Sequence, residues 1–142
     1  MKKIGMLAVP GLAIAYLAVA PHGCTTTSAP TPTPTLQVTV NATISYAGTN
    51  PSGTHQLYFA INNSNSYGSP VSGWQGQGNQ TSPFSTNVSM GSIVLNNGTN
   101  YALAYWSASG STSGPQGNDP KGSASFNVNK GGGSVSVNIT LL

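Results

Sequence analysis

Strict alternation of apolar and polar residues over 36–46 is the feature that most constrains the fold of this chain. Apolar side chains occupy every second position from Leu36 to Tyr46, and Gln, Thr, Asn or Ser fills each position between them. A period of two residues places all the apolar side chains on one face of a β-strand. We therefore predict a strand with one buried face and one solvated face.

Further segments of this kind follow as far as the C-terminus, and none beyond Cys24 has helical periodicity. In the segment Tyr101–Trp106, both alternating sets are apolar or aromatic, which predicts a central strand covered on both faces. The sequence around Val71 and Trp74 predicts an irregular edge segment, and the glycines after Lys130 predict a hairpin turn. The other predicted strands lie at 57–61, 84–90, 93–95, 126–128 and 135–141.

About seven short strands separated by turns rich in Gly, Asn and Pro are typical of a β-sandwich. We predict an all-β fold: a single antiparallel β-sandwich over 36–142, with Greek-key connections of the transthyretin or immunoglobulin type. This domain would follow a signal peptide at 1–23 and a tether at 24–35.

The N-terminal segment has the composition of an export signal. Lys2 and Lys3 precede the uncharged, mostly apolar run Ile4–Ala20, as in a secretory signal helix. Gly23-Cys24 resembles the lipobox of prokaryotic lipoproteins, which implies that the Cys24 thiol is acylated with diacylglycerol. Two alternatives stay open: an uncleaved N-terminal anchor, and secretion after cleavage. Each of them places the domain outside the membrane.

The tract Thr25–Thr35 alternates Thr with Pro and predicts a disordered, extended tether. At roughly 3 Å per residue it would reach about 30 Å. Such a spacer would hold the domain clear of a membrane surface.

Charge excludes several functions. The chain has four Lys, one Asp, and neither Arg nor Glu, and Lys2 and Lys3 belong to the leader. The remainder cannot neutralise phosphates, so we expect no nucleic-acid partner. Asp119 and His55 are the main titratable groups, without a GxSxG elbow or a cluster of metal ligands. We therefore expect no enzymatic activity, no cofactor and no metal, with His55 in a solvated turn and Asp119 in a turn.

The C-terminal third resembles the carboxypeptidase regulatory-like, or transthyretin-like, β-sandwich of exported prokaryotic proteins. The resemblance is carried by residues 92–109, 118–128 and 132–141. In that family a strand, a tight Gly turn, a strand that begins with an aromatic residue, an Asp-Pro-x-Gly segment and a valine-rich strand recur in this order. The resemblance implies a fold and a surface module, and not one activity.

Aromatic residues among polar loops are the candidate ligand-binding residues. Trp74 and Tyr67 lie in segments rich in Gly, Ser and Gln, and Tyr58 faces outward by parity. Aromatic rings beside amide and hydroxyl groups are suited to binding a carbohydrate or a peptide.

Six Asn-x-Ser/Thr motifs are candidate N-glycosylation sites, and all are expected to be accessible. They begin at Asn41, Asn62, Asn79, Asn87, Asn97 and Asn138.

Together these features predict a non-enzymatic lipoprotein on the outer face of a prokaryotic membrane, with glycans or copies of itself as further partners. One alternative is a carbohydrate- or peptide-binding module. Another is a subunit of a surface filament, in which the strand at Leu36–Tyr46 is donated to a neighbouring copy.

Overall fold

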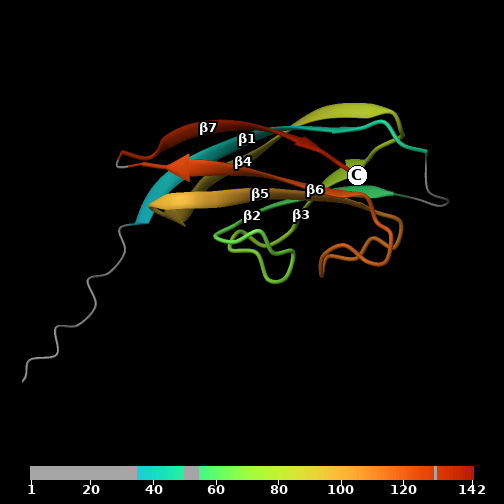
Figure 1. Ribbon diagram of the computed structural model, residues 1–142, viewed down its shortest axis with the longest axis horizontal. Coiled ribbons are helices and arrows are strands. Elements are labelled where there is room, and N and C mark those ends of the chain that lie inside the picture. The colour runs from blue at the N-terminus through green and yellow to red at the C-terminus, as the bar shows by residue number, and fades with distance from the viewer. Residues whose placement is uncertain (1–34, 50–54, 130) are drawn as a thin grey trace, which may run out of the picture. The chain divides into compact units, whose positions relative to one another are not determined.

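The computed structural model describes residues 35–49, 55–129 and 131–142 (Figure 1). The predicted signal peptide (1–23) and the predicted tether that begins with Cys24 (24–35) lie outside the described residues, except for Thr35.

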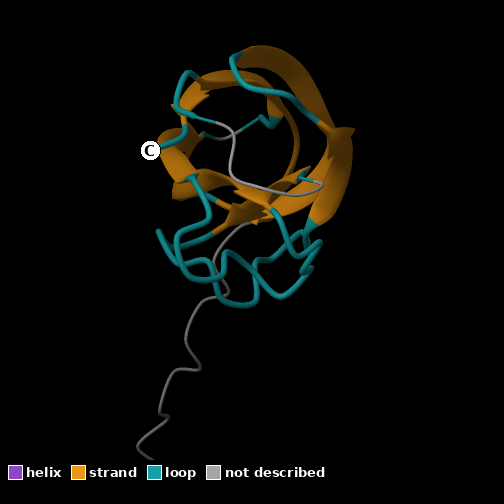
Figure 2. Cartoon of the chain, turned by 90° about the vertical axis from the view of Figure 1, so that its right-hand side faces the viewer, coloured by secondary structure: helices purple, strands orange, loops and turns teal. Residues whose placement is uncertain are grey.

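The described residues form a two-layered all-β domain, which confirms the predicted β-sandwich (Figures 1 and 2). One sheet has three strands in the order β4-β1-β7, and the other has four in the order β3-β2-β5-β6. No helix that could cross a bilayer occurs among these residues. The strands are β1 (Thr35–Tyr46), β2 (Gln56–Asn62), β3 (Gln75–Asn79), β4 (Phe84–Asn96), β5 (Gly98–Ser107), β6 (Lys121–Val128) and β7 (Gly133–Thr140).

The strand pairings are antiparallel with one exception. β1 lies between β4 and β7, antiparallel to β4 but parallel to β7. The first and last strands of the domain are therefore neighbours, a long-range pairing that the expected antiparallel arrangement did not include. The order also separates this domain from the immunoglobulin constant type, in which the first two strands share a sheet.

The hairpin predicted at 130–133 is wrong, because β6 and β7 belong to different sheets. The chain crosses from one layer to the other between these strands. The two strand edges meet instead at the far end, where the Lys121 and Leu142 backbones exchange N–H···O hydrogen bonds of 3.2 and 3.1 Å.

Two strands, β4 and β3, differ from the prediction by more than their exact ends. The segments 84–90 and 93–95 form one strand, β4, in which Met90 pairs with Val40 and Ile93 pairs with Val38. The extra residue in β4 makes a β-bulge there. The edge segment predicted around Val71 and Trp74 is loop, and the edge strand β3 begins directly after it. β3, with the sequence QGQGN, was not predicted because it has no apolar residue; it pairs with β2 through its backbone.

The core between the sheets is built from the apolar faces that the alternation predicted. Trp106 of β5 belongs to this core and is 1% exposed. Its ring centroid lies 5.2 Å from that of Tyr46, 5.3 Å from that of Phe84 and 4.8 Å from that of His55.

The four-stranded sheet is buried on its outer face as well. Tyr58, Ala60, Leu103 and Tyr105 point away from the inter-sheet core, yet each is at most 3% exposed. The segments 63–74 and 108–120 fold over them as irregular loops, teal in Figure 2. The prediction of a central strand covered on both faces is therefore confirmed for β5.

Candidate functional site

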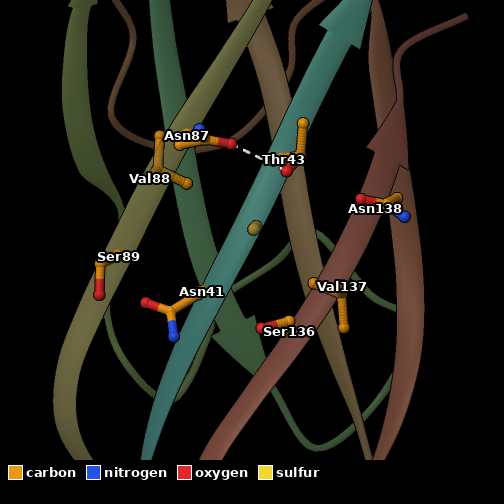
Figure 3. A pocket seen from close by; sticks show the side chains of 9 residues that line it. Asn41, Thr43, Asn87, Val88, Ser89, Ser136, Val137 and Asn138 are labelled. Atoms are coloured by element: carbon orange, nitrogen blue, oxygen red, sulfur yellow. Dashed lines mark hydrogen bonds between the residues drawn. The ribbon is translucent and has the colours of Figure 1, made fainter.

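The outer face of the three-stranded sheet is polar and carries a shallow cleft of about 330 Å³ (Figure 3). Alternation places Asn41 and Thr43 of β1 on this face between the polar residues of β4 and β7. None of the lining residues is charged, and the polar side chains among them are amides and hydroxyls. It is lined by Asn41, Ala42, Thr43, Asn87, Val88, Ser89, Ser136, Val137 and Asn138.

Hydrogen bonds across the strands organise part of this polar face. The Thr43 hydroxyl donates to Asn87 Oδ1 at 2.8 Å, as the dashed line in Figure 3 shows. Asn41 Nδ2 donates to the Ser134 hydroxyl at 2.9 Å. Among the described residues, no protein atom accepts a hydrogen bond from Asn87 Nδ2, and the side-chain amide of Asn138 makes no hydrogen bond. These groups are available to water or to a ligand.

A second group of aromatic residues, separate from those of the inter-sheet core, lies on the other sheet, over the outer face of β2 and β5. The rings of Tyr67 and Trp74 are stacked with centroids 6.1 Å apart, and the rings of Trp74 and Tyr105 are nearly perpendicular with centroids 4.6 Å apart. Tyr105 in turn stacks on Tyr58 at 4.9 Å. We call these four residues the aromatic cluster.

The expectation that Tyr58 is exposed is wrong, because only 3% of it is accessible. Its outward parity is correct, but the 108–120 loop covers that side of the strand. The Tyr58 hydroxyl lies 2.7 Å from the Gly110 carbonyl oxygen and 2.8 Å from Gln56 Oε1.

Trp74 and Tyr67 are half-buried, so the structure gives them a packing role as well as an accessible part. Trp74 borders a second open cleft, of about 370 Å³, between the two covering loops. Ser69 in its rim has a φ of +44°, an uncommon backbone conformation for a residue other than glycine. The cleft is lined by Ser69, Pro70, Gly73, Trp74, Thr112 and Ser113.

Burial also changes the chemistry of the tyrosines. It raises the pKa of Tyr105 to about 12, because the phenolate would be poorly solvated beneath the loops. Burial likewise raises the pKa of Tyr67, against a smaller opposing effect of a hydrogen bond with Ser123. Both side chains are therefore neutral at physiological pH and act as packing and hydrogen-bonding groups.

His55 is not in a solvated turn as expected. It is 5% exposed, and its ring packs against Trp106. Its Nε2 atom is buried and has no hydrogen-bond partner among the described residues. Asp119 occupies a turn, as expected, where its Oδ2 atom accepts a 2.9 Å hydrogen bond from the backbone N–H of Gln116.

Among the residues that the structure describes, no group of three His, Cys, Asp or Glu side chains is placed to hold a metal ion.

The six candidate glycosylation residues fall into different environments. Asn79, Asn87, Asn97 and Asn138 are exposed, and Asn41 is half-exposed. Asn62 is the exception, because it is 7% exposed and its Nδ2 atom donates to the Ser66 carbonyl oxygen at 2.9 Å. The expectation of accessibility is wrong for Asn62, which the loop after β2 covers.

Sequence reasoning missed the polar cleft, although the parity of its residues was visible in each strand. Asn87, Thr43 and Asn138 come from strands far apart along the chain, and only the order β4-β1-β7 places them side by side. The predicted glycosylation residues Asn41, Asn87 and Asn138 thus share one face.

No family model matches the chain, and neither known proteins nor solved structures show significant similarity to it.

Proposed function

We propose that this protein is an exported, non-enzymatic surface module, held on the outer face of a prokaryotic membrane by a lipid on Cys24. The observation that carries the proposal is the order of segments in the sequence. A positive start, an apolar run, Gly23-Cys24 and a Thr/Pro tract directly precede the first strand of the domain. The lipid would anchor the chain, and the tract would space the domain from the bilayer.

The domain itself supports a structural role. Its one carboxylate, Asp119, accepts a hydrogen bond within a turn, and His55 is packed under Trp106. Neither group lines either of the two clefts described above. General acid–base chemistry needs titratable groups within reach of a substrate, so this arrangement favours display over catalysis.

Metabolic labelling with a palmitate analogue tests the anchor. The native chain should take up the label and fractionate with membranes, and Cys24→Ser should lose the label. Absence of label from the native chain would contradict the lipoprotein; membrane retention would then indicate an uncleaved anchor, and release would indicate secretion.

The transthyretin-like resemblance belongs to this proposal. Its support is the order of features: β4, a tight turn at Gly98, β5 with Tyr101 near its start, and Asp119-Pro120 before β6. The valine-rich β7 closes the domain, as the resemblance implies.

A second candidate function is the binding of a neutral saccharide at the Trp74 cleft. An aromatic ring beside the hydroxyl groups of Ser69 and Thr112 offers stacking and hydrogen bonds without charge. Glycan-array binding that is lost in Trp74→Ala and weakened in Thr112→Ala would support it. Thr140→Ala, exposed on β7 of the opposite sheet and outside both clefts, is the matched control and should bind as the native chain does.

Donation of β1 to a neighbouring copy gains less support. β1 is the middle strand of its sheet, paired along its length with β4 and over most of its length with β7. Removing it would expose both neighbours, whereas an exchanged strand is most easily taken from an edge.

A further inference from the structure

The edges of the two sheets are protected to different degrees. β6 and β7 are edge strands, but Lys121 of β6 exchanges backbone hydrogen bonds with Leu142, just past the end of β7, which partly closes that side of the sandwich. β3 is an edge strand of only 5 residues, two of them glycine, with an irregular register against β2. β4 is an edge strand of 13 residues.

The first half of β4 is a regular strand with one unused edge. Seven consecutive residues, Phe84–Met90, pair with Tyr46–Val40 of β1. In an antiparallel ladder every second residue directs its N–H and C=O away from the partner strand. In the described part of the chain, no backbone hydrogen bond is made to that outer side of Phe84–Met90.

Little in β4 discourages pairing with another strand. Natural edge strands are blunted by Lys, Pro, inward charge or a bulge. β4 contains neither charge nor proline, and its bulge lies after Met90, beyond the regular half. Val94, past the bulge, is one of the few exposed large apolar residues at 53%.

We propose that the outer edge of β4 pairs antiparallel with β4 of a second copy of this chain. The two three-stranded sheets would then form one continuous six-stranded sheet across a two-fold axis. This inference deepens the proposed surface role, because it names the partner and the surface through which copies assemble, and it rests on that role for the local concentration of copies.

A second copy suits this edge for three reasons. The segment Phe84–Met90 has no charge, so two copies meet without repulsion. A two-fold axis lets each strand offer its N–H and C=O groups to the same groups of the other. The core-facing Val88 and Met90 and the outward Asn87 and Ser89 would both continue their faces across the new pair.

The contact is small, so we expect weak association in dilute solution. A regular stretch of seven residues supplies about six inter-chain hydrogen bonds, and association must offset lost translational freedom. Confinement to a membrane by a tether raises the effective concentration and favours the pair.

Asn87 and Asn138 give a matched test, because both are exposed on the same sheet face and both pair with Thr43, from opposite sides (Figure 3). A photo-crosslinking amino acid replaces each in turn in the full chain, which is irradiated in native membranes. We expect a dimer of two copies from position 87 at a yield at least tenfold above that from position 138. No dimer from position 87, equal yields from both positions, or a crosslink to a different protein would overturn the proposal.

Charge substitution provides the second arm. The double variant Asn87→Lys, Ser89→Lys places like charges across the new strand pair and should lower the dimer yield at least tenfold, with the crosslinker at Ser85. The control Ser136→Lys, Asn138→Lys adds the same charge on β7 and should leave the yield unchanged. Circular dichroism verifies that both variants fold; an undiminished dimer in folded Asn87→Lys, Ser89→Lys would overturn the proposal.

The Cys24 labelling experiment, run on the same membranes, separates the two proposals. A β4 dimer from a chain without lipid label supports the strand pairing while contradicting the lipoprotein. A labelled chain without the dimer supports the anchor and overturns the pairing.

Discussion

The two sheets of this domain have very different outer faces. The face of β4-β1-β7 is bare and carries amides and hydroxyls, including Thr43 and Asn138. The face of β2 and β5 is apolar and aromatic, with Tyr58 and Tyr105 hidden beneath two loops. Both sheets contribute their inner faces to the same core.

The difference shows that the pattern of apolar residues along a strand decides whether other segments must fold over its outer face. A strand with strict alternation, such as β1, needs one covering layer, and the opposite sheet supplies it. A strand that is apolar at both parities, such as β5, needs a second layer, because burying apolar area stabilises at roughly 25 cal/mol per Å². The loops 63–74 and 108–120 are that second layer. Covering the outer face of β2 and β5 is thus one reason for the length of these loops, in addition to any role in binding a ligand.

The largest expected effect on stability comes from removing a buried side chain beneath the loops that cover β2 and β5. Tyr105→Ala removes a fully buried ring that contacts Trp74 and Tyr58. By analogy with other large-to-small aromatic substitutions, it should lower the free energy of unfolding by about 3–4 kcal/mol, measured by denaturant titration. A loss below about 1 kcal/mol would show that the loops do not form a second core.

Alkaline pH should weaken the covered face more than the bare one. The unfolded chain releases the Tyr105 proton near its ordinary pKa of 10.0, whereas the folded chain holds it to about 12. Between these values the folded state binds more protons, so stability falls as pH rises. The loss across that interval is at most about 2 kcal/mol, at about 1.4 kcal/mol per pKa unit, because Tyr105 is partly ionised at both ends of it.

Tyr105→Phe provides the control for the alkaline effect. It keeps the ring but cannot ionise, and it also loses the hydrogen bond to the Ser111 carbonyl oxygen. Its stability should be lower near neutral pH and should change less between pH 10 and pH 12. An unchanged pH dependence would assign the alkaline loss to other tyrosines.

The close contact between β6 and the end of β7 should not accommodate even one added methyl group. A Cβ atom at Gly122 of β6 would collide with the Thr140 carbonyl oxygen and lie 2.9 Å from Ile139 Cγ2. Gly122→Ala should therefore lower the melting temperature and cost about 1–3 kcal/mol. Gly91→Ala in the β4 bulge, where nothing lies within 4 Å, is the matched control. Equal melting temperatures would mean that β6 and β7 do not approach so closely.

The smallest effect is expected on the bare face. Asn138 is exposed, and Asn138→Ala should change the free energy of unfolding by less than about 0.5 kcal/mol. A clearly larger loss, measured in the same denaturant titration, would indicate that this face is covered in the assembled protein. That outcome would remove the contrast between the two faces.

Much of the fold was predictable because alternation is a local property. β1, β2, β5 and β7 lie where the period-two pattern predicted them. β3 escaped prediction because QGQGN contains no apolar residue and pairs through its backbone. The hairpin before β7 was predicted wrongly because a glycine-rich turn does not show whether the chain continues in the same sheet or crosses to the other.

The candidate sites were less predictable, because exposure depends on more than parity. Tyr58 and Asn62 lie on the outer side of β2, as parity indicates, yet the covering loops bury both. His55 follows a Gly-Thr pair in the sequence, which predicted a solvated turn, but its ring packs on Trp106 of β5. The burial of Tyr58 and Asn62 by the loops and the packing of His55 on Trp106 leave no signal in the local sequence.

The sequence by itself determined that this domain is built of strands, which side chains share a face of each strand, and that charge is nearly absent. Side-chain parity and composition are local properties, so they can be read along the chain. Only the tertiary structure decided that β1 is central, that Asn87 and Asn138 flank Thr43, and which loops cover the outer face of β5. These features depend on pairings between distant segments, which are selected by the burial of the whole core and not by any one strand.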